Sequence, residues 1–240
     1  MRRLLWPLLG KDLWQLGGHY LTRAGLRFNE GPVVKVDRRG RAWIADCSER
    51  ILERPFVLLN LGIQAGRVLD VGCRSGLTGL QLASYGFEVT GVDIAPWDVE
   101  HPRFRFVQTD VRTLPFPDAA FDAAVAVSTL EHVGWEDGRR VDGEGDARAV
   151  ASIRRVLRPG GCFLVSVPFG RPALGRGQRV FDRPGIEELL RGFEMEVVRH
   201  GVKDGPVWRV ANESEAAARD STIHCSAVVM VKCRKPVEER

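Results

Sequence analysis

The sequence VLDVGCRSG, residues 68–76, is an apolar strand that ends near an acidic residue and runs into a glycine turn. A helix is expected directly after it, over residues 76–85. Glycines let the backbone approach a ligand closely because no Cβ intervenes. The first turn of a helix presents unpaired N–H groups to an electron-rich atom. The acid Asp70 favours a ligand with positive charge or with hydroxyl and amine donors, so the stretch predicts a small-molecule cradle.

Composition excludes several other classes of protein. The 240 residues are 44% apolar and carry a net charge of +4, which is too small and too dispersed to argue for a nucleic-acid partner. The five cysteines are odd in number and form no C-x-x-C pair, which predicts neither a disulfide framework nor a zinc knot and fits a reducing cytoplasm. No stretch approaches the roughly 20 apolar residues that a membrane span needs. Pro7 interrupts the short apolar start, so no signal peptide is predicted.

The first part of the chain differs from the rest. Residues 1–30 carry a leucine stripe that predicts a helical lead-in, and two β-rich runs at 33–36 and 41–45 flank a polar turn typical of a β-hairpin. A further helix is expected over residues 48–60. We therefore predict an N-terminal extension over residues 1–62 and a main domain over residues 63–240. The extension would serve as a cap or as an oligomer contact, which would allow a homodimer.

From residue 67 onward, strands and helices alternate. Strands are expected at 67–71, 88–92, 104–108, 121–127 and 162–167, with helices at 76–85, 146–157 and 183–191. Nearly continuous apolar strands in this order predict an α/β fold whose parallel sheet has helices on both faces. Two late strands, 193–198 and 223–231, are expected to pair antiparallel at one edge. The stretches 137–146 and 203–221 are expected to be irregular.

Acidic residues follow three successive strands of this sheet. Asp70, Asp93 and Asp110 would meet at the carboxyl ends of the strands, where open α/β sheets bind ligands. A carboxylate after the second strand suits the two hydroxyls of a ribose, and one after the third suits an adenine amino group. Any one of these acids alone could instead cap a turn. All three in register predict a nucleoside site.

Several motifs together resemble those of the class I S-adenosylmethionine-dependent methyltransferases. They are VLDVGCRSG (68–76), GVDI (91–94), TDVRTLPFPDAAFD (109–122), STLEHV (128–133) and RVLRPGG (155–161). Three further features are similar to an uncharacterised bacterial subgroup of that family: HPRFRFVQTD (101–110), the acidic insertion after STLEHVG (128–134), and the VPFG (167–170) and QRVFD (178–182) stretch. The resemblance implies a Rossmann-like, mostly parallel seven-stranded sheet with a reversed edge strand. It makes residues 63–240 a catalytic domain with S-adenosylmethionine as cofactor and S-adenosylhomocysteine as product.

The resemblance also implies which residues contact the cofactor. Asp93 would bind the ribose, and Ile94 would pack on the adenine. The remaining implied contacts are Asp70, Gly72, Cys73, Gly76, Asp110, Val111 and Ser128. Arg74 stands where the family usually has a second glycine. It would either reach the cofactor carboxylate or point to solvent.

Methyl transfer often needs a base for the proton of the acceptor. His132 follows the fourth strand and is the candidate base, and Glu131 is the alternative catalytic residue, acting through orientation or metal binding. The acids Asp142, Glu144 and Asp146 could hold Mg²⁺, although a solvated acidic loop is the preferred interpretation and no metal site is predicted. An anionic acceptor could be held by a group of arginines near residue 175, which are Arg171, Arg176 and Arg179.

The leading hypothesis is methylation of an oxygen or nitrogen atom of a small-molecule acceptor, such as a sugar or a natural product. A nucleic-acid methyltransferase is disfavoured because STLE (128–131) stands where an N-P-P-[YF] tetrad would be and no basic arm is visible. A nicotinamide dehydrogenase is disfavoured because G-x-G-x-x-G is absent and Asp70 would repel a pyrophosphate. A cofactor-binding protein without catalysis stays open as a further alternative.

Overall fold

The computed structural model describes residues 33–37, 39–74, 76–175 and 177–237. The predicted helical lead-in over residues 1–30, Arg176 and Ser75 lie outside these ranges. No helix in the described part of the chain is both long and apolar enough to cross a membrane.

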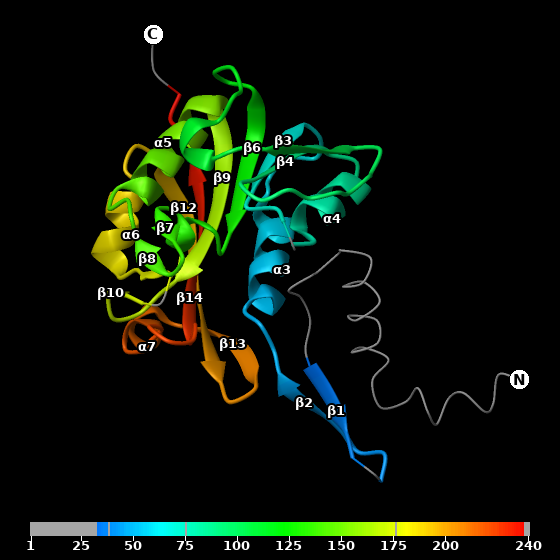
Figure 1. Cartoon of the computed structure of the whole chain (residues 1–240), viewed down its shortest axis with the longest axis vertical. Helices are drawn as coiled ribbons and strands as arrows, with labels where there is room; N and C mark the ends of the chain where they lie inside the picture. Colours follow the sequence, from blue (N-terminus) through cyan, green and yellow to red (C-terminus); the bar gives the residue numbers. More distant parts are fainter. Residues whose placement is uncertain (1–32, 38, 75, 176, 238–240) are drawn as a thin grey trace, which may run out of the picture.

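A sheet of eight strands forms the centre of the molecule (Figure 1). Across the sheet the strands are β13 (Val207–Ala211), β12 (Glu194–Asp204), β14 (Ala227–Arg234), β9 (Leu157–Pro168), β6 (Phe121–Val127), β3 (Arg67–Val71), β4 (Glu88–Asp93) and β5 (Phe104–Gln108). The five strands from β9 to β5 run parallel. Their apolar sequences match this arrangement, since Ala123 through Ala126 of β6 are fully buried. The α/β class and the parallel sheet are therefore confirmed.

The late strands correct two details of the expected sheet. The expected antiparallel pairing of two late strands is confirmed by β12 and β14, but β14 also pairs antiparallel with β9, so this reversed strand lies inside the sheet, and the reversed strand at the edge is β13. Strand β13 adds an eighth strand beyond the expected seven, within the stretch 203–221 that we expected to be irregular. A two-residue turn of Gly205 and Pro206 joins β12 to β13, and Gly205 has a φ of +57°. A glycine with positive φ at the first turn position suits a tight hairpin, which is why the chain folds back here.

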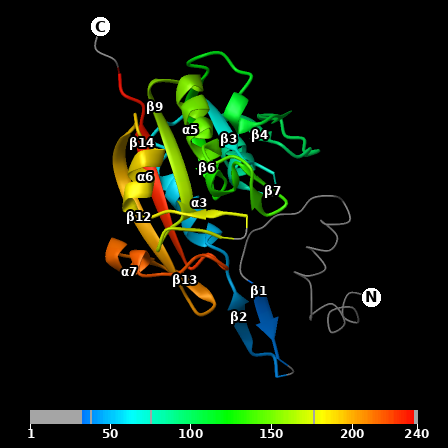
Figure 2. The same cartoon turned by 60° about the vertical axis from the view of Figure 1, so that its left-hand side comes forward.

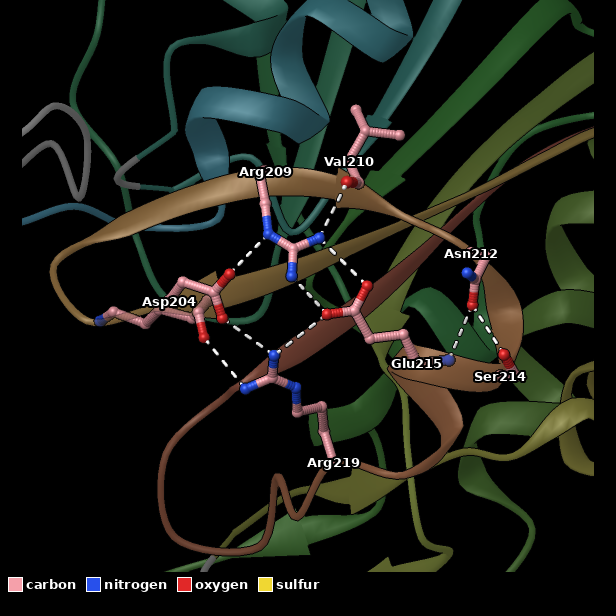
Figure 3. Close-up of polar contacts among 8 residues, drawn as sticks. Asp204, Arg209, Val210, Asn212, Ser214, Glu215 and Arg219 are labelled. Atoms are coloured by element: carbon pink, nitrogen blue, oxygen red, sulfur yellow. Dashed lines mark hydrogen bonds and ion pairs between the residues drawn. The ribbon is translucent and has the colours of Figure 1, made fainter.

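A charged network fastens this edge hairpin to the short helix α7 (Glu213–Ala217), as Figure 3 shows. Arg209 on β13 contacts Asp204 at 2.5 Å and also pairs with Glu215 on α7. Arg219 contacts Asp204 at 2.9 Å and Glu215 at 3.4 Å. These four side chains are about one-third exposed or more, so screening by water keeps the contribution of each pair to stability small. We therefore expect the network to orient the hairpin against α7 and to contribute little to the free energy of unfolding.

Helices cover both faces of the sheet (Figures 1 and 2). The helices α5 (Gly145–Val156) and α6 (Arg183–Leu189) lie on one face, and α3 (Arg50–Asn60) and α4 (Thr78–Ser84) lie on the other. Because side chains alternate along a strand, Ala124 of β6 packs into the core under α5 whereas Val125 packs into the core under α3. Packing against these two cores on opposite faces keeps the sheet, and with it the carboxyl ends of its strands, in place.

The predicted β-hairpin is confirmed as β1 (Val33–Val36) and β2 (Ala42–Asp46), which extend away from the sheet in both views (Figures 1 and 2). Helix α3, which follows it, packs Phe56 and Val57 into the same core as α4. The helix predicted over residues 48–60 is thereby confirmed in position. The division of the chain at residue 62 and a role of the hairpin in a homodimer stay predictions.

Candidate functional site

Two cavities adjoin the carboxyl ends of β3, β4, β5 and β6, at the point where the strand order reverses. The main cavity has a volume of about 310 Å³, and the smaller one has a volume of about 130 Å³. Val71, Gly72 and Ser128 line both of them. The two cavities are therefore neighbouring compartments of one site, in the place where open α/β sheets bind ligands.

The glycine turn after β3 contributes to the walls of both compartments. Gly72 has a φ of +70°, and a Cβ on it would lie 2.3 Å from Cγ2 and Oγ1 of Thr129. Its N–H donates to the carbonyl oxygen of Val92 at 2.8 Å, which fastens the turn to β4. Gly76 shows no such crowding, since its Cβ would meet only the carbonyl oxygen of Cys73 at 3.5 Å. Of the two predicted turn glycines, Gly72 is the one that sterics require.

Asp70 and Cys73 are both buried beside this turn. Asp70 lines the smaller cavity, yet its carboxylate also packs against Gly79 at the start of α4, where a Cβ would lie 2.3 Å from Oδ2. The thiol of Cys73 packs against Gly91 of β4, and burial raises its pKa far above the usual range. Any contact of Cys73 with a ligand is therefore expected through its backbone.

Asp93 lies at the end of β4 in the wall of the main cavity. Its Oδ1 accepts a hydrogen bond from the N–H of Ala95 at 2.9 Å, and its Oδ2 accepts one from the N–H of Arg74 at 3.2 Å. Two backbone donors thus hold the carboxylate in one orientation. The adjacent Ile94 lines the same cavity and is 70% exposed, so a flat apolar ligand group could cover it.

Asp110 caps the 3₁₀ turn η1 (Val111–Thr113) at the end of β5. The Arg112 side chain bonds Asp110 at 2.6 Å and, together with the Arg112 N–H, holds the pKa of this carboxyl below its usual range. Arg112 also contacts Asp142 at 2.9 Å. This link joins the predicted adenine edge to the loop that carries the short hairpin of β7 (Trp135–Glu136) and β8 (Arg139–Arg140), whose Trp135 lines the main cavity.

The predicted base His132 ends the 3₁₀ turn η2 (Leu130–His132) and lines the main cavity. Its Nδ1 lies 2.7 Å from the carbonyl oxygen of Gly177. Because a carbonyl oxygen can only accept, Nδ1 carries the proton and donates, and Nε2 of the neutral ring keeps its lone pair. This tautomer can take a proton from a ligand in the cavity.

Glu131 points into the protein interior. Burial raises the pKa of Glu131 to about 8, so the carboxyl is largely protonated at neutral pH. Its Oε1 lies 3.8 Å from Nε2 of His132, and its Oε2 has no hydrogen-bond partner in the described part of the chain. The two predicted catalytic side chains are thus brought together, but only His132 lines a cavity.

A group of polar residues that the sequence did not predict lies behind Ser128. Ser128 Oγ donates to Oε1 of Glu53 at 2.7 Å, and Glu53 Oε2 accepts from Arg50 at 2.5 Å. Glu53 is fully buried and Arg50 lines the smaller cavity. The signal was present in the sequence, because Glu53 stands one turn before Phe56 and Val57 on the inward-facing side of its helix. A carboxylate at such a position is rarely buried without a partner.

The structure gives the remaining predicted charges other roles. Asp146, considered for Mg²⁺, contacts Arg179 at 2.6 Å, and Asp142 is held by Arg112 and Arg148. No group of three His, Cys, Asp or Glu side chains within the described ranges is placed to hold a metal ion. The Arg179 guanidinium also stacks on Phe181 at 4.5 Å. Neither Arg171 nor Arg179 lines the two cavities, and an anionic acceptor held by this group of arginines stays a prediction.

Comparison with known proteins agrees with this geometry. Residues 69–165 match the family model described as a methyltransferase domain. A probable S-adenosylmethionine-dependent methyltransferase of Mycolicibacterium smegmatis is 38% identical over 149 residues. The match covers 55% of this chain and 54% of that relative, so the chain spans about half the length of the curated relative.

Two solved structures show similar folds. The [4+2]-cyclase SpnF has a TM-score of 0.61 and 22% identity, covering 92% of this chain and 95% of that one, a likeness that shows the fold alone. The 1,6-didemethyltoxoflavin-N1-methyltransferase of Burkholderia thailandensis, solved with bound 1,6-didemethyltoxoflavin and S-adenosylhomocysteine, has a TM-score of 0.55 and 25% identity. It covers 79% of this chain and 80% of its own. Over residues 69–165 the chain is thus similar to the methyltransferase domain, in the same stretch that supplies Asp70, Asp93 and Asp110 at the carboxyl ends of the strands.

Proposed function

We propose that this chain transfers the methyl group of S-adenosylmethionine to an oxygen or nitrogen atom of a small-molecule acceptor. The observation that carries the proposal is the main cavity, whose lining combines Asp93, Ile94, Asp110 and Val111 with His132. The first four residues fit a nucleoside, with a carboxylate for the ribose hydroxyls and an apolar surface for the adenine ring. When bound, the cofactor supplies an electrophilic methyl group at its sulfonium.

The protein's own contribution is positioning and proton removal. Val133 and Trp135 line the same cavity as His132, and their apolar side chains favour an acceptor with an apolar or aromatic part. The Nε2 lone pair of His132 would take the proton of the acceptor as the new bond to carbon forms. The N1-methyltransferase of Burkholderia thailandensis, whose structure holds the small molecule 1,6-didemethyltoxoflavin, supports this class of acceptor.

Replacing Asp93 by alanine should weaken the binding of S-adenosylhomocysteine by about 10- to 100-fold, the range expected for loss of a charge-assisted contact. Isothermal titration calorimetry measures this affinity directly. Asp118→Ala is the matched control, because Asp118 is 78% exposed and pairs only with Arg155 in the described part of the chain. Equal affinities for wild type and Asp93→Ala would show that the ribose lies elsewhere.

The proposed base is tested by the rate of methyl transfer from radiolabelled S-adenosylmethionine to a panel of phenols, sugars and amines. For any acceptor that wild type methylates, His132→Ala should lower kcat by at least about 100-fold without weakening the binding of S-adenosylhomocysteine. If Glu131 is the base instead, Glu131→Gln should show the larger loss, and the wild-type kcat should rise with pH toward about 8. An unchanged kcat in both variants would rule out both assignments.

A further inference from the structure

The smaller cavity has a volume of about 130 Å³ and is lined by three charged residues. Its lining includes the acidic residue Asp70 and two arginines, Arg50 and Arg74. Arg50 comes from α3, which precedes the predicted main domain, and the other residues come from the β3 turn, the start of α4 and the end of β6. A segment of the predicted N-terminal extension therefore forms part of the wall of the site.

The guanidinium of Arg50 is held rigidly. Its side chain is only 14% exposed, and its Nη1 contacts Glu53 at 2.5 Å and Glu49 at 3.4 Å. Burial opposes the positive charge, but the two glutamates outweigh burial and raise the pKa of Arg50, so the group is always cationic. Within the described ranges no hydrogen bond is formed by Nε or Nη2 of Arg50. One side of the planar guanidinium is thus available to a further acceptor.

The ligand chemistry that fits this arrangement is a carboxylate. An arginine fork binds a carboxylate through two parallel hydrogen bonds, and a fork that is already oriented loses less entropy on binding. An amino acid group would place a carboxylate near Arg50 and an ammonium near Asp70, which lines the same cavity. Since Gly72 and Ser128 line both compartments, one ligand can place its nucleoside in the main cavity and its amino acid end in the smaller one.

We propose that Arg50 of α3 binds the carboxylate of the cofactor's amino acid end, and that Glu53 is a positioning residue that orients Arg50 and joins it to Ser128. The proposal rests on the proposed function, because it names a further residue for the same cofactor. Arg74 is the competing residue, since it lines the same cavity, but its side chain is exposed and no ion pair holds it within the described ranges. Helix α3 then completes the cofactor site instead of merely covering it.

The experiment compares two ligands by isothermal titration calorimetry. S-adenosylhomocysteine has the amino acid end, whereas 5′-methylthioadenosine has the same nucleoside and sulfur without it. Arg50→Gln should weaken the binding of S-adenosylhomocysteine by about 10- to 100-fold and leave that of 5′-methylthioadenosine unchanged. Arg50→Lys should recover only part of the affinity, because an ammonium lacks the fork. Arg183→Gln is the matched control, since Arg183 is also held by two glutamates, Glu187 and Glu213, but away from both cavities.

Removal of Arg50 alone leaves the buried Glu53 without its cation, which could disturb the fold. The double variant Arg50→Gln/Glu53→Gln removes both charges and should show the same selective loss. An equal loss for both ligands in the double variant would overturn the proposal and make the pair structural. An unchanged affinity for S-adenosylhomocysteine, or a selective loss in Arg74→Gln alone, would also overturn it. If wild type binds neither ligand, the proposed function itself fails.

Discussion

Gly72→Ala is expected to lower the free energy of unfolding by about 3 kcal/mol, the sum of backbone strain and a forced clash. The backbone at Gly72 has a φ of +70°, a conformation that L-residues with a Cβ rarely adopt. The added Cβ would also lie 2.3 Å from Thr129. Thr129 cannot easily move away, because its Oγ1 donates toward the carbonyl oxygens of Val71 at 3.2 Å and Val127 at 3.1 Å.

Urea denaturation of purified variants measures this effect. Gly205→Ala is the matched control, because Gly205 also has a positive φ of +57° but a Cβ there would meet nothing within 4 Å. The control should lose only about 1 kcal/mol, the part that comes from backbone strain. If the two variants lose equal stability, the close approach of Thr129 to the glycine turn is not what requires Gly72.

Glu131→Gln is expected to stabilise the protein at alkaline pH. The pKa of Glu131 is about 8 in the folded protein and about 4.3 when unfolded, so between these values the folded state binds more protons. Wild-type stability should therefore fall as pH rises through this window, by at most about 1.4 kcal/mol per pH unit from this group. Glutamine does not titrate, so the variant should keep a flatter profile and should exceed wild type most at pH 8.

Urea denaturation at pH 5, 6, 7 and 8 gives the two profiles. The advantage of Glu131→Gln should grow toward pH 8, to no more than about 4 kcal/mol over these three pH units. Glu194→Gln, at an exposed position on β12, should follow the wild-type profile. Parallel profiles for wild type and Glu131→Gln would contradict a protonated, buried Glu131.

The strands of the parallel sheet could be predicted because a strand buried on both faces must be apolar throughout. The short apolar run from Ala123 to Ala126, which is fully buried, is typical of such a strand, and the end of each strand locates the acid that follows it. The hairpin at β13 was missed because Val207, Arg209 and Val210 are exposed on the outer strand, so its pattern is no stronger than that of a loop. The Gly205–Pro206 turn was the one local signal for it.

The candidate site divides in a similar way. The nucleoside side was predictable because each acid follows its strand directly. Arg50 and Glu53 reach the site from α3 through tertiary packing, and the inward-facing position of Glu53 on its helix was the local signal for them. The arginines near residue 175 could be considered for an anionic substrate because the sequence does not reveal that Arg179 has a buried partner in Asp146. Charge in a loop predicts a ligand site poorly until its ion pairs are known.

The most direct test of the whole account is a calorimetric titration of the full chain with S-adenosylhomocysteine and, separately, with NAD⁺. The acids at the ends of β3, β4 and β5 fit a nucleoside without a pyrophosphate, and Asp70 near the glycine turn would repel one. We therefore expect S-adenosylhomocysteine to bind at one site per chain and NAD⁺ not to bind detectably. Binding of NAD⁺ with no binding of S-adenosylhomocysteine would contradict the account.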